Sequence, residues 1–264
     1  MKYYQKALFD EMVSFYLVTA NDEGDELGRI RALMGGLVRK ARKAIPQEEE
    51  TKLKIHKLLQ LVYGDWGFYC DPNNYFQSCN LYINQVLETH QGMPVSLGAI
   101  VLYLADSLNL PLYPVNFPTQ LILRAEADEQ VAFIDPWDGK YISRHKLQQL
   151  YEGAFGFGAK LSIEELAVSD AAELLNRFAQ LAKHTLIREG QSDAALKYIN
   201  TLVRRYPQDP YEIRDRGLVL AQMGCYHAAM EDLQYFIEQR PDDPSVFLLI
   251  AQMSELKQNH YSIH

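Results

Sequence analysis

A self-similarity of 34 residues near the C-terminus constrains the fold of this chain more than any other feature. Tyr206-Pro207-Gln208-Asp209-Pro210 recurs as Arg240-Pro241-Asp242-Asp243-Pro244, and the same interval pairs Gly190 with Gly224. Small residues are needed where paired helices approach closely, and proline is tolerated only where a helix has ended. The interval therefore predicts a stack of helix pairs.

The second unit of this repeat reads as two helices with a stop between them. Gly224 separates two apolar helical patterns, of about residues 211–223 and 227–239. A glycine at such a junction is typical of a helix C-terminus. Gly217 and Ala229 are small enough for the positions where the two helices approach each other.

The repeats cover residues 176–209 and 210–243, and an apolar helix of about residues 245–256 is expected to cap the stack. The first repeat departs at one point, because Lys183 stands where the second has Gly217. Two units and a cap fall below the roughly three repeats that independent stability usually needs. We therefore expect the array to pack on the preceding domain or on a sister subunit, in which case the protein is a homo-oligomer.

Composition indicates a globular protein with two domains, which we place at residues 1–165 and 166–264. A chain of 264 residues, of which 48% are hydrophobic, is long and apolar enough to bury a sizeable core. Its 26 basic and 34 acidic side chains give a net charge of −8, which disfavours nucleic acid as a partner.

The cysteines and the apolar segments predict a cytoplasmic protein without a metal or other cofactor. Cys70, Cys79 and Cys225 cannot form a closed disulfide framework, and their spacing fits no metal site. The N-terminus lacks an apolar signal core. The longest apolar run, residues 95–105, stops at Asp106 before it could cross a bilayer, so we expect no membrane association.

The chain reads as mainly helical up to about residue 109. Apolar residues recur at helical spacing over residues 27–45 and 52–63, and Gly35-Gly36 is a candidate break in the first of these segments. The basic cluster of residues 39–43 is interpreted as a solvated helix face, because charge on a helix is usually exposed and acidic residues follow at once.

The central block predicts a buried helix packed on a small antiparallel sheet. Leu97, Ile100 and Leu104 lie at helical spacing within an apolar segment that ends near Asn109 and Pro111. Short β-like runs follow, and the two that flank the polar stretch from Ala127 to Gln130 are expected to form a hairpin. These strands are expected at residues 112–115, 121–124 and 131–134. The predicted fold class is therefore α+β and mostly helical, followed by an all-α repeat domain.

From about Tyr63 to Leu256 the chain resembles the transglutaminase-like family, in the bacterial SirB type that carries tetratricopeptide repeats after this domain. The fragments that carry the resemblance are Asn80 and Asn84, Gly92-Met93-Pro94-Val95-Ser96-Leu97, Phe117-Pro118-Thr119-Gln120-Leu121, Asp135-Pro136 and the 34-residue repeats. Each fragment alone is a weak signal, whereas their combination is specific. The resemblance implies a papain-like α+β domain, and the family's association with regulatory operons implies a modulating role.

Active members of this superfamily use a cysteine at the start of the core helix, a histidine on the next strand and an aspartate after it. Histidine takes the thiol proton, aspartate orients the imidazole, and the thiolate attacks an amide carbonyl. Here the cysteine position falls at Pro94 or Ser96, the histidine position falls at Gln120, and only Asp135 matches. Because glutamine is no general base near neutral pH, the triad is degenerate.

Several roles remain open for the residues around this position. The candidate pocket residues are Asn80, Asn84, Ser96, Gln120, Asp135 and Trp137. Ser96 suits the first turn of the core helix, where its hydroxyl would satisfy backbone N–H groups, and Asp135 suits a turn. Asn80 and Asn84, one helical turn apart, would either line the pocket or hold the following turn.

The sequence leads to three function hypotheses. The first is a non-catalytic adaptor or regulatory protein, a pseudoenzyme that binds a protein partner through the repeats. The second is an amide hydrolase or acyl transferase with a rearranged site around Ser96 and Asp135, for which His90 or His145 would have to supply the base. A displaced Cys70 or Cys79 nucleophile is a variant of this second hypothesis. The third is a pocket for a small ligand in the same cleft.

Overall fold

The computed structural model describes residues 4–20 and 24–261, with side chains as far as residue 254. The chain divides into two compact units, and the boundary falls between Ala182 and Lys183, inside α7. The elements as far as this helix are α1 (Tyr4–Thr19), α2 (Glu26–Ala44), α3 (Thr51–Leu59), η1 (Gln60–Asp65), η2 (Ser78–Asn80), α4 (Ile83–Thr89), α5 (Pro94–Ser107), β1 (Leu112–Val115), β2 (Ile122–Ala127), β3 (Gln130–Asp135), β4 (Lys140–Ile142), α6 (Arg144–Phe155), η3 (Glu164–Leu166) and α7 (Ala171–Arg188).

The sheet of the first unit has four antiparallel strands in the order β1-β2-β3-β4. The predicted hairpin is confirmed: β2 and β3 are joined by Asp128 and Glu129, whose φ angles of 53° and 60° suit a two-residue hairpin turn. The short edge strand β4 was not predicted. With these strands among helices, the predicted α+β, mostly helical class is also confirmed.

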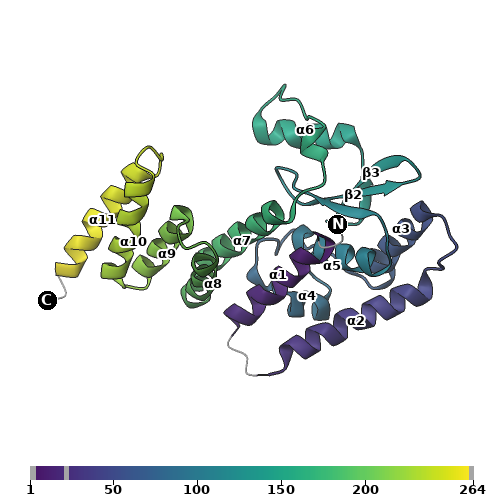
Figure 1. Ribbon diagram of the computed structural model, residues 1–264, viewed down its shortest axis with the longest axis horizontal. Helices are drawn as coiled ribbons and strands as arrows, with labels where there is room; N and C mark the ends of the chain where they lie inside the picture. Colours follow the sequence, from purple (N-terminus) through teal and green to yellow (C-terminus); the bar gives the residue numbers. More distant parts are fainter. Residues whose placement is uncertain (1–3, 21–23, 262–264) are drawn as a thin grey trace. The chain divides into compact units, whose positions relative to one another are not determined.

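Helix α5 lies against one face of this sheet and α6 against the other (Figure 1). Almost all of α5 is buried, which explains why its sequence is apolar on every side. Gly98 allows the close contact with the segment that leads into β2. A Cβ atom at this position would lie 2.5 Å from Cδ2 of Leu121.

The second face of the sheet is covered by α6 and by the segment that follows it. Ile122 of β2 and Leu147 of α6 are fully buried in this cluster, and Phe133 of β3 packs against it. Because neighbouring residues of a strand point to opposite faces, Leu123 and Ile134 contribute to the α5 side instead. Because alternate residues of the strands face opposite sides, each face of this small sheet is covered by an apolar layer.

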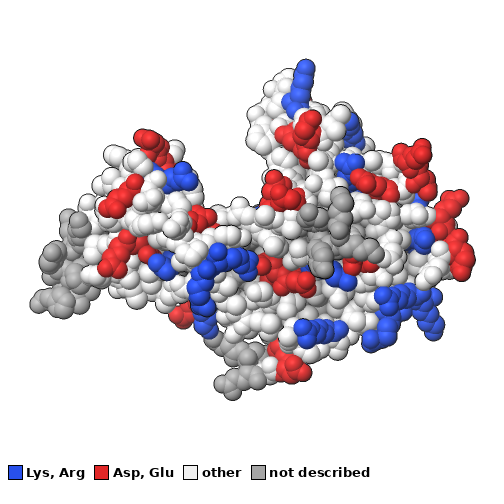
Figure 2. Space-filling view, viewed as in Figure 1, with Lys and Arg blue, Asp and Glu red and all other residues white. Residues whose placement is uncertain are grey.

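Helix α2 is continuous from Glu26 to Ala44, so Gly35-Gly36, the candidate break, does not interrupt it. Its buried face is formed by Ile30, Met34, Leu37 and Ala41. The apolar contacts along this face outweigh the cost of about 1 kcal/mol that each helical glycine carries. Acidic and basic side chains are interspersed on the face that Figure 2 shows, with basic ones along α2, as expected for a solvated helix surface.

A π-helical turn, η1, extends α3 and aims a tyrosine at the sheet. The hydroxyl of Tyr63 donates a 2.8 Å hydrogen bond to the carbonyl of Pro136, just beyond β3. Gly139, with a φ of 70°, leaves room for the ring, since a Cβ atom there would lie 2.2 Å from it. The hydrogen bond from Tyr63 of η1 therefore fixes the turn that contains Asp135 and Pro136.

The second unit consists of helices, as the repeat predicted. After the end of α7 come α8 (Ser192–Arg205), α9 (Pro210–Gln222), α10 (Tyr226–Gln239) and α11 (Val246–Tyr261). Gly224, the predicted stop, and Gly190, its counterpart one repeat earlier, have φ angles of 77° and 70°, and each follows a helix. Helix α11 covers α10, because Leu249 and Met253 share a buried cluster with Leu233.

Lys183, which stands where the second repeat has Gly217, belongs to a buried ion cluster. The ammonium group of Lys183 is fully buried and lies 2.8 Å from Glu212 Oε2 and 2.7 Å from Asp215 Oδ2. Glu212 and Asp215 are three residues apart on α9 and so share a face. Burial raises the pKa of the Glu212 carboxyl, which the adjacent ammonium opposes. A paired charge thus fills the place where the next repeat has a glycine.

Within the described part of the chain, no helix combines the length and apolarity needed to cross a membrane.

Replacement of Gly217 by alanine is expected to destabilise the repeat unit by about 1–3 kcal/mol. The new Cβ would lie 2.9 Å from Asp232 Cβ and 3.2 Å from the Ala229 carbonyl, and neither atom is the end of a flexible side chain. The control is Gly153→Ala in α6, where nothing lies within 4 Å and the higher helix propensity of alanine should be neutral or stabilising. Chemical denaturation monitored by circular dichroism measures both, and equal effects of the two changes would contradict the close helix contact.

Candidate functional site

The hydroxyl of Ser96 is used entirely inside the fold. It is fully buried in the first turn of α5, accepts a 2.9 Å hydrogen bond from the Met93 N–H and donates a 2.7 Å one to the carbonyl of Asn80. It also lies 3.0 Å from the Met93 carbonyl. A first-turn hydroxyl that satisfies the N-cap N–H stabilises the start of the helix. Pro94 precedes it at the first helical position, where its missing N–H costs nothing.

Gln120 and Asp135 lie together at the end of the sheet next to α5. A side-chain hydrogen bond joins them, and the N–H of Trp137 donates a second one of 2.9 Å to Asp135 Oδ1. Burial raises the pKa of the Asp135 carboxyl, although both hydrogen bonds oppose this shift. The pair has the arrangement in which a histidine would be oriented by an aspartate, but the amide of Gln120 accepts no proton near neutral pH.

The two asparagines do not share a helix, because Tyr82 between them has an extended backbone. Asn80 ends η2, and its amide donates hydrogen bonds of 2.6 Å and 3.2 Å to the carbonyls of Asn74 and Tyr75. Asn84 lies on α4, and its buried Oδ1 has no hydrogen-bond partner in the described part of the chain. Asn80 therefore holds the preceding loop and, through its own carbonyl, Ser96.

The histidines proposed as alternative bases are engaged elsewhere. His90 Nδ1 lies 2.6 Å from the carbonyl of Trp66, and its ring stacks on Phe68 at 4.3 Å. His145 Nε2 lies 3.2 Å from the amide nitrogen of Gln149. Among the described residues, neither histidine forms a hydrogen bond with Ser96 or with a cysteine.

The cysteines proposed as displaced nucleophiles are not the hydrogen-bond partners of His90 or His145 among the described residues. Burial, followed by the charges of Asp71 and Asp135, raises the pKa of the Cys70 thiol to about 12, so this thiol is protonated at neutral pH. Cys79 Sγ lies 3.5 Å from Gln77 Oε1. A thiol held protonated is a poor nucleophile.

A cavity of about 160 Å³ opens beside these positions. Of the predicted pocket residues its lining includes Gln120 alone, together with Pro94, one of the predicted triad positions. The full set is Tyr75, Phe76, Met93, Pro94, Val95, Thr119, Gln120, Leu121, Arg177 and Leu181. The ring of Trp137 stacks on Tyr75, with centroids 5.3 Å apart. Trp137 is therefore a neighbour of the cavity wall.

Arg177, which was not among the predicted site residues, is the only charged residue among the described ones that line this cavity. Its guanidinium donates hydrogen bonds to Asn116 Oδ1 at 2.8 Å, to the Pro118 carbonyl at 3.1 Å and to the Phe117 carbonyl. The arginine lies on α7, about sixty residues after these acceptors. No local pattern in the sequence reveals such a long-range contact.

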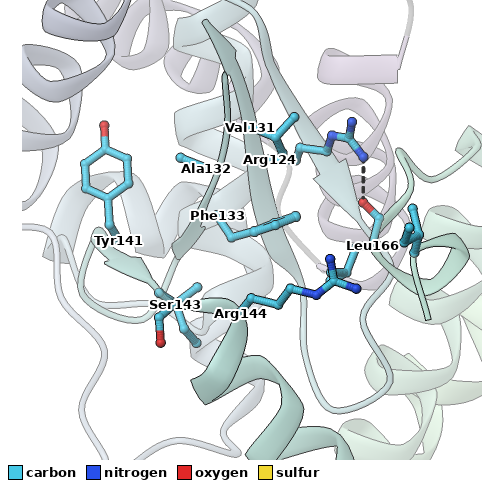
Figure 3. A pocket seen from close by; sticks show the side chains of 10 residues that line it. Arg124, Val131, Ala132, Phe133, Tyr141, Ser143, Arg144 and Leu166 are labelled. Carbon is cyan, nitrogen blue, oxygen red and sulfur yellow. Dashed lines mark hydrogen bonds between the residues drawn. The ribbon is translucent and has the colours of Figure 1, made fainter. Parts of the chain in front are cut away.

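A larger hollow of about 510 Å³ lies on the α6 side of the sheet (Figure 3). Phe133 and Tyr141 contribute to its walls, and Arg124 borders it, donating a 2.9 Å hydrogen bond to the carbonyl of Leu166. Arg144 extends beneath Phe133 in this view. The lining contains no cysteine, histidine or carboxylate, so it offers neither the thiol nor the base of the superfamily's chemistry.

Removal of the Ser96 hydroxyl is expected to cost about 1–3 kcal/mol of stability, because the buried Met93 N–H and the Asn80 carbonyl lose their partner. The variant is Ser96→Ala, and the measurement is urea denaturation. Ser254→Ala is the control, since that hydroxyl is exposed and its hydrogen bond within the described part of the chain goes to the carbonyl of Ile250 on its own helix. If Ser96→Ala were as stable as the control, the structural role of the hydroxyl would be wrong.

Comparison with known proteins agrees with this architecture. The family model described as the transglutaminase-like superfamily matches residues 29–180, and a tetratricopeptide repeat model matches residues 182–254. No solved structure shows significant similarity to the chain.

Curated relatives match over most or all of their length. A UPF0162 protein of Pasteurella multocida is 62% identical over the whole of both chains. The UPF0162 protein YchA of Escherichia coli is 40% identical over 93% of this chain and 89% of its own. Protein SirB1 of Salmonella typhimurium is 41% identical over 84% of each. The chain therefore belongs to the transglutaminase-like superfamily, in the family of the SirB1 and UPF0162 proteins, with tetratricopeptide repeats after the transglutaminase-like domain.

Proposed function

We propose that this protein is a non-catalytic adaptor or regulator that binds a protein partner and acts in the cytoplasm. In this proposal residues 1–165 form a transglutaminase-like scaffold and residues 166–264 form the repeat domain that binds a protein partner. The observation that carries the proposal is the use of the Ser96 hydroxyl within the fold, with Gln120 beside Asp135 where a base would be needed.

Amide chemistry at Ser96 would require activation of its hydroxyl. A serine hydroxyl attacks an amide only when a neighbouring base takes its proton. Ser96 is fully buried, and its hydrogen-bond partners are backbone groups of Met93 and Asn80. An amide hydrolase or acyl transferase built on Ser96 and Asp135 would need a base that these contacts do not include. The alternative enzyme function is therefore disfavoured.

The repeat unit offers a surface suited to a partner. A hollow of about 720 Å³ lies at the junction of the two repeats, and Tyr206, Tyr211, Arg205 and Arg240 contribute to its lining. Tyr206 is 52% exposed, and the Arg240 guanidinium lies 5.7 Å from the centre of the Tyr211 ring. Tyrosine and arginine are enriched among the residues that dominate binding energy at protein interfaces.

The last helix of the described chain departs from a simple cap. A terminal repeat usually presents a polar outer face to solvent. On α11, however, Phe247 is 81% exposed, Leu248 is 69% exposed and Ile250 is 51% exposed. Neighbouring apolar side chains with such exposure favour a contact with another protein.

Capture of a partner from a bacterial lysate with the full-length protein tests this proposal. Tyr206→Ala with Arg240→Ala is expected to reduce the captured partner by about tenfold or more, because both side chains border the hollow and contribute little to the core. Phe157→Ala is the control, since this side chain is fully exposed and lies in the first unit. A partner captured equally by the double variant and the control would place binding outside this hollow and contradict the proposal.

A further inference from the structure

Arg177 is a half-buried cation without an acid beside it. Its guanidinium donates to three neutral oxygens, those of Asn116, Phe117 and Pro118, and it forms no ion pair with any described carboxylate. A guanidinium has five N–H groups, so two remain after these three hydrogen bonds. Burial lowers the pKa of this guanidinium, which means that its charge has lost part of its hydration without gaining a counter-charge.

The cavity that Arg177 lines is positive and offers hydrogen-bond donors. None of its ten lining residues is an aspartate or a glutamate. The hydroxyls of Tyr75 and Thr119 belong to this lining, and neither has a hydrogen bond to another described residue. In a chain of net charge −8, a cavity with one arginine and no acid selects for anions.

The carboxyl group of Asp135, whose charge acts on Tyr75, is not part of the cavity wall. It is held by Gln120 and by the N–H of Trp137. The first residues of α5, Pro94 and Val95, also border the cavity, and the positive end of that helix adds to the arginine in the same direction.

We propose that this cavity binds a carboxylate carried on a short apolar stem. The arginine's two remaining N–H groups and the hydroxyls of Tyr75 and Thr119 bind the carboxylate, and Phe76, Leu121 and Leu181 surround the stem. A volume of about 160 Å³ corresponds to about five water molecules, which suits a carboxylate with two or three carbons. Arg177 and Leu181 fall within the predicted first repeat, but the cavity belongs to the first compact unit, and the proposal does not rest on the repeats binding a partner.

This chemistry has two sources, a small free acid or the C-terminal residue of a protein chain. The experiment uses the full-length protein with Trp66→Phe, which leaves Trp137, stacked on the cavity residue Tyr75, as its only tryptophan. Trp137 fluorescence is titrated with propionate, propionamide, inorganic phosphate, acetyl-Gly-Ala with a free carboxylate and the amide of the same peptide. Tighter binding of the free peptide than of propionate identifies the C-terminus of a protein chain as the ligand. Equal or weaker binding of the peptide identifies a small acid.

Saturable binding of propionate or the free peptide, without binding of either amide, is the expected result. Arg177→Gln should weaken it by about tenfold or more, because charge-assisted hydrogen bonds are lost. Arg177→Lys should retain part of the affinity. The control Arg188→Gln, at an exposed position on the same helix, should leave the affinity unchanged.

A second variant separates binding from a purely structural role of Arg177. Tyr75→Phe with Thr119→Val removes two donors from the cavity and leaves the arginine's three hydrogen bonds in place. It is expected to weaken carboxylate binding severalfold even if Arg177→Gln fails to fold. Unchanged affinity in this variant, equal binding of acid and amide, preference for phosphate, or no saturable binding by the Trp66→Phe protein would each overturn the proposal.

Discussion

The hydrogen bonds of the Ser96 hydroxyl hold the start of α5 in place, and the first unit is arranged around that helix. The hydroxyl joins the Met93 N–H to the carbonyl of Asn80, and the amide of Asn80 in turn holds the loop at Asn74 and Tyr75. From this fixed start, α5 runs buried beneath the sheet. Ser96, one of the two positions where the resemblance would put the catalytic cysteine, therefore has a structural role in this fold.

Gln120 in the first unit and Lys183 in the repeats also have structural roles. Gln120 keeps the hydrogen bond to Asp135 that a histidine would make, but it cannot take up a proton. In the second unit, Lys183 replaces a close glycine contact with a buried ion cluster on Glu212 and Asp215. Removing one partner of such a cluster leaves an uncompensated buried charge, which is strongly destabilising. Both substitutions are compatible with the fold because neighbouring polar groups satisfy them.

Much of the fold could be predicted because its signals are local. The glycine stops at Gly190 and Gly224 and the turn at residues 128–129 depend on short-range backbone geometry, which the sequence displays directly. The continuity of α2 through Gly35-Gly36 was not foreseen, because tertiary packing overrides helix propensity there. The first-turn role of Ser96 was anticipated from its place near the start of the apolar core helix, whereas its acceptor on Asn80 lies sixteen residues away.

The residues that the sequence did not reveal are those that depend on long-range contacts. Arg177 reaches the cavity only because α7 packs against the segment of residues 116–118. Likewise, the acids that pair with Lys183 lie 29 and 32 residues away. No periodicity or motif in one sequence encodes such pairs, so the positive charge of the cavity emerges only in three dimensions.

The proposed function depends most on the inference that this transglutaminase-like domain does not catalyse amide chemistry. Its most direct test is the turnover of amide and ester probes by the full-length protein beside Ser96→Ala at neutral pH. The account predicts that neither protein accelerates hydrolysis or acyl transfer above the rate in buffer. Turnover by the natural sequence that Ser96→Ala abolishes, while circular dichroism shows the variant to be folded, would contradict it.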